Sequence, residues 1–396
     1  MEKVVLAFSG GLDTSFCAVY LTRVAGLEVH AVMVDLGGFA PDELRQAEDR
    51  AYAMGVKTFT VINDADRYYQ DCIRYLIFGN VLKNNTYPLS VSSERVFQAT
   101  AIASHAKAIG ARYIAHGSTG AGNDQVRFDM IFRILVPEAE ILTPIRDLRL
   151  SRQQEIDFLR EHGIEMSFEK AQYSINKGLW GTSVGGKETL TSTLALPESA
   201  FPTPLSRTAP ETITLRFGQG EVREVNGVPH DNPVDAIRHL QQLAGPYAIG
   251  RDLHVGDTLI GIKGRVGFEA AAPMIILKAH HLVEKHTLTK QQLLVKDQLS
   301  LLYGNYLHDG LVLDPVMRDI EAFFAGTQEN VSGLVHILLE PYRFTLIGVE
   351  TPHDLMSPRF GAYGEMNNAW SGEDVKGFAK IYANALSIYH QVHDAS

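Results

Sequence analysis

Short apolar runs alternate with longer amphipathic stretches through the first part of the chain. Strand-like runs occur at 4–8, 29–34 and 56–62, and again in the segments RYIAHG and EILTPI. Helical patterns lie between them at 43–54 and 92–109, and a further helix opens at Ser151, which has Gln154 at capping-box spacing. Strands and helices in alternation predict an α/β domain with a doubly wound parallel sheet.

The pattern changes after this helix. Residues 168–210 are rich in Gly, Ser, Thr and Pro with little periodicity, which predicts a linker or a functional loop. Beyond it we expect a strand at 211–217, a hairpin at the Asn226-Gly227 pair, helices at 233–243 and 274–302 with a break near Thr287, and a strand at 344–349. This mixture lacks strict alternation and favours an α+β domain.

The last segment is amphipathic. Apolar residues recur at heptad-like spacing on one face of 373–390, which predicts a helix. The helix either packs on its own domain or docks on a neighbouring subunit. The predicted organisation is therefore a first domain at 1–167, a second at 168–365 and a C-terminal helix at 366–396.

Composition narrows the possible partners. The chain has 396 residues and a formal net charge of -10, so a broad nucleic-acid interface is disfavoured and an anionic ligand must be held locally. Cys17 and Cys72 are too few for a disulfide framework, and we expect both to be buried. We find neither a signal-peptide pattern nor an apolar stretch near the length of a membrane span, so we expect a cytoplasmic protein.

The segment AFSGGLDTS, residues 7–15, joins the first strand to a helix. Glycines let a backbone turn its N–H groups toward a ligand, and the following helix N-terminus adds free donors and partial positive charge. Ser9, Thr14 and Ser15 add hydroxyl groups. This combination predicts a phosphate cradle, although a Walker A lysine is missing.

The spacing S-G-G-x-D-[ST]-S resembles the PP-loop of ATP pyrophosphatases, which cleave ATP between its α- and β-phosphates. The alternative is a plain glycine-rich turn between a strand and a helix. The two hydroxyl residues and Asp13 favour the PP-loop.

A second motif, GSTGAGNDQVRFD at 117–129, crowds polar groups between glycines. Arg127 can hold a carboxylate through two hydrogen bonds, and Asp124 can pair with an ammonium group. Such a set suits small zwitterions. The alternative is a solvated polar loop.

Together these motifs make the sequence similar to the argininosuccinate synthase family. The matching segments also include NVLKNNTYPLS, TPIRD, YSINKGLWGTS, KDQL and TQENVSGLV. The resemblance implies an ATP-dependent ligase in which the ureido oxygen of citrulline attacks ATP, with its Mg²⁺, and pyrophosphate leaves. The amine of aspartate then displaces AMP from citrullyl-adenylate to give argininosuccinate. It also implies a homotetramer with the C-terminal helix as an inter-subunit arm.

The resemblance implies site residues as well. Positioning and charge stabilisation at the reacting phosphates would come from Ser9, Gly10, Gly11, Asp13, Thr14 and Ser15. ATP would contact these residues together with Ala7, Phe8, Leu12, Val34 and Gly117. Aspartate would be held by Thr119, Asn123 and Asp124, and citrulline by Tyr87, Ser92, Asn123, Arg127, Ser174 and Ser183.

The sequence departs from the family pattern near the nucleotide. Ala121 stands where the family usually has lysine, Gly38 stands where it often has glutamine, and Val34 replaces a usual alanine.

The departures near citrulline are larger. In VGDTLIGIKGRVGFE, residues 255–269, Gly256 replaces the family's citrulline-binding glutamate and Phe268 replaces a tyrosine. The α-ammonium group of citrulline would thereby lose partners. One hypothesis is that the substrate is an N-acylcitrulline, and the alternative is that a nearby acid, such as Asp257 or Glu269, takes over.

Other functions also stay open at this stage. A PP-loop enzyme that adenylates tRNA is disfavoured by the acidic charge, and a non-catalytic nucleotide-binding scaffold is disfavoured by the intact motifs. His280, His281 and His286 lack a metal-ligand spacing, so we expect no protein-bound metal, and Mg²⁺ would arrive with ATP.

Overall fold

The computed structural model describes residues 1–164, 173–365 and 369–394. The chain divides into two compact units, Met1–Pro352 and His353–Ser396. The domain boundary predicted at 167/168 lies outside the described residues, and the one predicted at 365/366 adjoins the gap at 366–368.

The first unit begins with a five-stranded sheet that is parallel throughout, as the alternating pattern predicts. Its order is β3-β2-β1-β4-β5. Strand β1 is therefore central, with β2 and β3 on one side of it and β4 and β5 on the other. The strands are β1 Lys3–Ala7, β2 Glu28–Asp35, β3 Thr58–Asn63, β4 Tyr113–Ala115 and β5 Glu140–Leu142.

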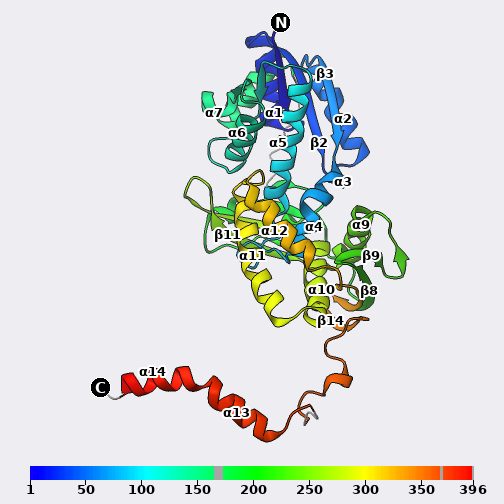
Figure 1. The fold of residues 1–396 in the computed structure, drawn as a ribbon. Helices are drawn as coiled ribbons and strands as arrows, with labels where there is room; N and C mark the ends of the chain where they lie inside the picture. The colour runs from blue at the N-terminus through cyan, green and yellow to red at the C-terminus, as the bar shows by residue number, and fades with distance from the viewer. Residues whose placement is uncertain (165–172, 366–368, 395–396) are drawn as a thin grey trace. The chain divides into compact units, whose positions relative to one another are not determined.

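Both faces of this sheet are covered by helices (Figure 1). In β1, Val4 and Leu6 belong to one buried cluster, whereas Val5 and Ala7 belong to another, because successive side chains of a strand point to opposite faces. The first cluster includes residues of α1 Leu12–Val19, α2 Pro41–Ala53 and α8 Arg152–Glu161. The second includes residues of α5 Ser90–Ala108 and α6 Asp124–Leu135, which confirms a doubly wound sheet.

Short helices complete this part of the chain. They are η1 Tyr20–Val24, α3 Ala65–Tyr68, η2 Tyr69–Ile73, α4 Arg74–Phe78 and α7 Pro144–Leu148. The predicted capping box of α8 is present, since the Gln154 N–H group donates to Ser151 Oγ and the Ser151 N–H group donates to Gln154 Oε1. Cys17 and Cys72 are both buried, as predicted.

Two antiparallel sheets follow. The five-stranded sheet has the order β10-β9-β8-β13-β14, and the four-stranded sheet has the order β11-β12-β7-β6. The predicted hairpin joins β9 to β10 through Asn226 and Gly227, whose φ angles are 49° and 80°. The strands are β6 Ser174–Asn176, β7 Thr182–Gly185, β8 Glu211–Gly218, β9 Glu221–Val225, β10 Val228–Pro229, β11 Arg251–Asp257, β12 Lys263–Glu269, β13 Gly333–Glu340 and β14 Arg343–Glu350.

Helices accompany these sheets as an α+β domain requires. The predicted break near Thr287 is confirmed, because α10 ends there and Thr289 caps the next helix with Gln292. The helices are α9 Pro233–Ala244, α10 Ala271–Thr287, α11 Lys290–His308 and α12 Pro315–Gly326, with short turns η3 Lys187–Leu190, η4 Glu198–Ala200 and η5 Gly245–Tyr247.

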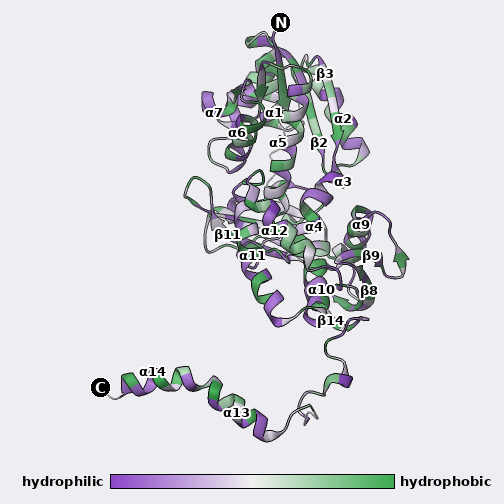
Figure 2. Cartoon of the chain, in the orientation of Figure 1, coloured by the Kyte–Doolittle hydropathy of each residue, from purple (hydrophilic) through white to green (hydrophobic). Residues whose placement is uncertain are grey.

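Three segments differ in detail from the sequence-based expectation. The region predicted as a linker or loop carries β6 and β7 of the four-stranded sheet. The polar motif at 117–129 contains the start of helix α6. The C-terminal segment forms two helices, α13 Gly372–Tyr382 and α14 Asn384–Asp394, after the turn η6 Pro358–Phe360, and hydrophobic and hydrophilic residues alternate along both (Figure 2).

Helix α5 joins the parallel sheet to the second part of the first unit. It contacts β1 and β2 on one side and β7 and α11 on the other. The residue before it, Leu89, adopts a left-handed conformation with φ of 63°, which turns the chain sharply into the helix. In the part of the chain that the structure describes, no helix is both long and apolar enough to cross a membrane.

Candidate active site

A cavity of about 1470 Å³ lies at the carboxyl ends of β1, β2 and β4. Its lining includes Ala7–Thr14 after β1, Val34 and Leu36 at β2, and His116–Thr119 after β4. Helix α5, the segment 174–178 and the β11–β12 hairpin complete it. Ligands of open α/β sheets bind at this edge, where the strand order reverses on either side of β1.

The glycine turn, Ser9–Thr14, is held by its own hydroxyl groups. Ser9 Oγ lies 3.2 Å from Thr14 Oγ1, and the Gly11 N–H group donates to Ser9 Oγ at 3.4 Å. Gly10 has a φ of 74°, a conformation that L-residues rarely adopt. Helix α1 begins next to Gly11 without a side-chain cap, so its first N–H groups remain available to an anion.

The polar loop after β4 approaches this turn closely. A Cβ atom on Gly117 would lie 3.2 Å from the carbonyl carbon of Asp13 and 3.3 Å from Thr14 Cγ2. A larger residue would push the two loops apart. Gly117 therefore brings the polar loop next to the glycine turn, and Gly117 and Val34 line the same cavity.

Cationic side chains surround the glycine turn. Arg50 Nη1 donates to the Gly10 carbonyl oxygen at 3.3 Å, and Arg152 and Lys177 also line the cavity. These positive charges can stabilise a polyphosphate in a chain that is acidic as a whole.

An acid that the sequence reading missed lies behind the turn. Glu155 on α8 is buried, and burial, together with the charge of Asp13 and a hydrogen bond to it, raises the pKa of Glu155 to about 8. Asp13 and Glu155 thus form a hydrogen-bonded pair of acids beside the glycine turn.

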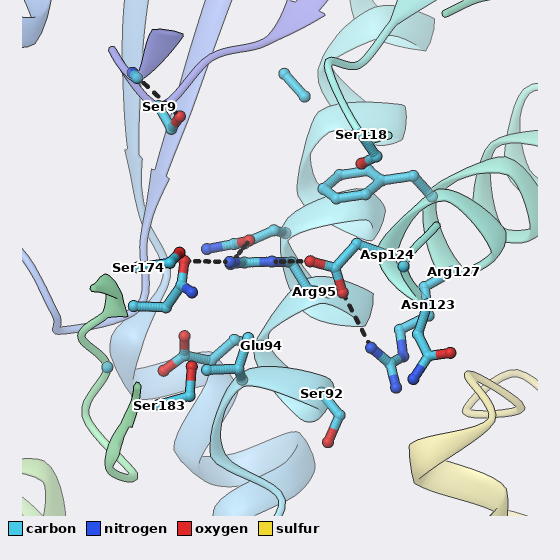
Figure 3. Close-up of a pocket in the computed structure, with 18 of the residues that line it drawn as sticks. Ser9, Ser92, Glu94, Arg95, Ser118, Asn123, Asp124, Arg127, Ser174 and Ser183 are labelled. Atoms are coloured by element: carbon cyan, nitrogen blue, oxygen red, sulfur yellow. Dashed lines mark hydrogen bonds and ion pairs between the residues drawn. The ribbon is translucent and has the colours of Figure 1, made fainter. Parts of the chain in front are cut away.

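The polar loop runs into helix α6, where Asp124 and Arg127 form a chain of ion pairs with Arg95 of helix α5 (Figure 3). Arg95 Nε and Arg127 Nη1 each lie 3.0 Å from a carboxylate oxygen of Asp124. Burial opposes ionisation of Asp124, but the two guanidinium groups outweigh it and hold its pKa below the usual range. Asp124 is thus held as an anion between two guanidinium groups.

Arg127 is more constrained than its sequence context indicates. Its Nε and Nη2 groups both donate to the His308 carbonyl oxygen, at 3.0 and 2.7 Å. The backbone therefore occupies one edge of the guanidinium group, and Asp124 pairs with Nη1 on the other side. Asn123 ties the loop to the β11–β12 hairpin, because its Oδ1 accepts from the Leu259 N–H group at 2.8 Å.

The remaining predicted residues line the opposite side. Tyr87 is buried, and its ring stacks on His254 with centroids 5.2 Å apart. Ser92 is buried on α5, Ser183 is buried on β7, and Ser174 is exposed at the start of β6.

All but one of the predicted site residues line this single cavity. The exception is Ser15, which is fully buried and lies outside the lining. Its N–H group donates to the Gly11 carbonyl oxygen, and its hydroxyl group has no hydrogen-bond partner within the described residues.

Two family profiles together match most of the chain. "Arginosuccinate synthase N-terminal HUP domain" matches residues 3–165, and "Arginosuccinate synthase C-terminal domain" matches residues 173–389. The chain belongs to the argininosuccinate synthase family. It is an ATP-dependent ligase, as the sequence resemblance implied.

Relatives of the argininosuccinate synthase family match over nearly their full length. The argininosuccinate synthase of Dictyoglomus thermophilum is 35% identical over 391 residues, which cover 98% of this chain and 97% of the relative. That of Methanocaldococcus jannaschii is 34% identical over 369 residues, with 92% and 93% covered. That of Pyrococcus furiosus is 32% identical over 402 residues, with 100% and 97% covered.

Two departures from the argininosuccinate synthase pattern have steric explanations. A Cβ atom on Gly38 would lie 2.7 Å from the Lys177 carbonyl oxygen, so segment 177–178 passes where a side chain would start. A Cβ atom on Gly256 would lie 2.6 Å from His254 Nε2. The His254 ring, stacked on Tyr87, therefore fills the space beside Gly256. Burial, with His308 and Lys83 nearby, lowers the pKa of His254 to about 4.

Neither acid suggested as a substitute is free. Asp257 lines the cavity but pairs with Lys263 at 2.6 Å. Glu269 lies outside the lining, accepts a hydrogen bond from Thr203 Oγ1 at 2.6 Å and lies 3.7 Å from Arg251. Phe268 is buried behind Tyr87, with ring centroids 5.5 Å apart, and is also absent from the lining.

The sequence reading missed Glu94, a buried acid on α5 that lines the cavity. A glutamate within a helix usually indicates a solvated face, so no local signal marks this one. Of the histidines at 280–286, His280 belongs to a buried hydrogen-bond network. His280 is buried and hydrogen-bonded to Asn80 and Gln328, and the described residues contain no cluster of acids, histidines and cysteines suited to a metal ion.

Proposed function

We propose that this chain joins citrulline to aspartate at the cavity beside β1, with ATP cleaved to AMP and pyrophosphate. The observation that carries the proposal is the convergence of the glycine turn, the polar loop and the α5 residues on one cavity. The chemistry needs a phosphate cradle and two amino-acid sites within reach of each other, and positioning supplies much of the rate.

The first step places ATP against the glycine turn, with its adenosine beside Val34 and Gly117. The ureido oxygen of citrulline attacks the α-phosphorus, the α–β phosphoanhydride bond breaks, and pyrophosphate leaves. N–H groups at the start of α1, the hydroxyl groups of Ser9 and Thr14, and Arg50 would stabilise the departing charge. Citrulline would lie along Tyr87, Ser92, Asn123, Arg127, Ser174 and Ser183.

The second step brings in aspartate at Thr119, Asn123 and Asp124. Its amine attacks the activated ureido carbon, and the bond to the AMP oxygen breaks to give argininosuccinate. Asp124 would orient the amine as a carboxylate, since Arg95 and Arg127 keep it ionised. Mg²⁺ would enter with the phosphates and keep most of its waters.

We also propose a cytoplasmic homotetramer. The supporting observation is the unit His353–Ser396, whose helices α13 and α14 expose apolar side chains, among them Phe378, Ile381, Tyr382, Leu386 and Tyr389. Exposed apolar patches of this kind commonly mark protein–protein contacts.

An assay of the purified chain with ATP, citrulline and aspartate tests the reaction. We expect AMP, pyrophosphate and argininosuccinate in equal amounts, and no turnover when either amino acid is omitted. ADP as the nucleotide product, or pyrophosphate release that is independent of citrulline, would refute the proposal.

A further inference from the structure

Glu94 is a buried carboxyl group without a full set of partners. Its residue is 3% exposed, yet it lines the cavity. Its Oε1 atom has no hydrogen-bond partner in the described part of the chain. A buried, unsatisfied carboxyl group is costly, so a protein that keeps one commonly uses it for a ligand.

The surroundings of Glu94 belong to the proposed citrulline site. Figure 3 places its carboxyl group on the same side of the cavity as Ser174 and Ser183, away from the Arg95–Asp124–Arg127 chain. The group lies over Gly178, where a Cβ atom would overlap Glu94 Oε1. Gly178 thus makes the room that Glu94 occupies. We call Glu94, Ser174, Gly178 and Ser183 the α5 wall.

Other acids along the cavity are already engaged. Asp124 pairs with two arginines, Asp257 pairs with Lys263, and Glu43 accepts from the Ala40 N–H group at 2.8 Å. Asp13 also lines the cavity, but it belongs to the glycine turn and shares a hydrogen bond with Glu155. The neighbouring guanidinium group of Arg95 points to Asp124 rather than to Glu94. Among the described acids that line the cavity, Glu94 is the one with a buried carboxyl oxygen that has no hydrogen-bond partner, so it is best able to receive a new cation.

We propose that Glu94 receives the α-ammonium group of citrulline and replaces the acid that the family pattern has at the position of Gly256. This inference rests on the proposed function, and it names the form of the substrate as free citrulline. An N-acylcitrulline has a neutral amide in place of the ammonium group, so it cannot form the ion pair. Glu94 is thus a specificity residue for the known reaction class.

The electrostatics around Glu94 favour a cationic ligand. Burial raises the pKa of Glu94 to about 8, and Asp35 adds to the effect, while Arg95 and the Leu179 N–H group oppose it. An ammonium group beside the carboxylate would favour the ionised form again. When citrulline binds, its α-ammonium group and the Glu94 carboxylate would therefore each gain an ion-pair partner.

Steady-state kinetics of Glu94→Gln test the proposal, with pyrophosphate release as the readout and citrulline or N-acetylcitrulline as the substrate. For the unaltered chain we expect kcat/KM for citrulline to exceed that for N-acetylcitrulline by at least about 100-fold. In Glu94→Gln, the KM for citrulline should rise at least about tenfold and the preference should shrink by a similar factor. The KM values for ATP and aspartate should change less than about twofold.

Two further variants separate this role from a structural one. Gly178→Ala should displace the Glu94 carboxyl group and raise the KM for citrulline in the same direction. Glu321→Gln is the matched control, because Glu321 is a buried acid outside the cavity that pairs with Tyr303 and Arg318. Its citrulline preference should equal that of the unaltered chain.

The outcomes distinguish this inference from the proposed function. If the unaltered chain prefers N-acetylcitrulline, or if Glu94→Gln keeps the full preference for citrulline, Glu94 does not bind the ammonium group, although the ligase reaction stands. If no citrulline compound supports pyrophosphate release, the proposed function itself fails.

Discussion

The glycine turn and the α5 wall lie on the same cavity but are built in different ways. The turn uses backbone N–H groups and two hydroxyl groups that bond to each other, so its geometry is set before a ligand arrives. The α5 wall uses a side chain from a helix and a glycine from a distant segment, and it keeps a carboxyl oxygen unsatisfied. The turn follows the family pattern, whereas the other side of the cavity departs from it at Gly256, and Phe268 departs from it behind Tyr87.

This difference indicates how one reaction can be kept while its substrate contacts change. In the proposed mechanism, pyrophosphate release depends on a backbone shape that few substitutions leave intact. The proposed contact to the α-ammonium group of citrulline depends on a single carboxylate. Different members of the family can supply this carboxylate from different strands or helices. The following predictions test that division, from the largest expected effect to the smallest.

Gly10→Val should nearly abolish turnover. A β-branched residue cannot readily adopt the φ of 74°, so the N–H groups of the turn would be redirected. Loss of one preorganised donor typically lowers kcat by about 100-fold or more, and we expect at least this loss in a pyrophosphate-release assay. Thermal unfolding checks that the variant is folded. A folded variant with kcat within about threefold of the unaltered chain would contradict a role for the turn in catalysis.

The pH dependence should report the α5 wall. Below a pKa of about 8 the free Glu94 is protonated, and an ammonium group binds only the ionised form, so the KM for citrulline should rise as the pH falls. Between pH 7 and pH 6 the rise should be about tenfold. The dependence should be absent in Glu94→Gln, in which Arg95 and Asp35 remain as the charged neighbours. An identical pH profile in both proteins would assign the titration to another group.

Phe268→Tyr should have the smallest effect on citrulline. The Phe268 ring lies behind Tyr87 and outside the cavity lining, so a restored hydroxyl group would not reach the ligand. We expect the KM for citrulline to change less than about twofold, whereas an unsatisfied buried hydroxyl group would lower stability by about 1–3 kcal/mol. Kinetics and denaturant unfolding measure the two effects separately. A marked fall in KM would show that the lost hydroxyl group is what the site lacks.

The sequence predicts the parallel sheet, its helices and the glycine turn because these features have local signals. Val4–Ala7 is apolar on both faces, which indicates a buried strand. Residues 9–15 have the spacing S-G-G-x-D-[ST]-S of the PP-loop. Ser15 shows the limit of such a motif, since its hydroxyl group is buried outside the cavity lining. The start of α6 at Asp124 was also obscured, because Gly, Asn and Asp are typical of loops.

Glu94 was not predictable in the same way. Its local sequence, VSSERVF, is that of an ordinary polar helix face, and helices commonly carry glutamate in solvent. Its burial depends on Gly178, which comes from the four-stranded sheet region far along the chain. The loss of the acid at Gly256 is visible in the sequence, but the position of a replacement is a property of the folded chain.

A structure determined with citrulline and a non-hydrolysable ATP analogue tests both sides of the cavity at once. We predict the β- and γ-phosphates at Gly10 and Gly11, and the α-ammonium nitrogen of citrulline about 2.7–2.9 Å from a carboxyl oxygen of Glu94. If the ammonium group contacts Asp257, or contacts no acid at all, Glu94 does not replace the acid that the family pattern has at the position of Gly256. A triphosphate bound away from the glycine turn would contradict the whole account.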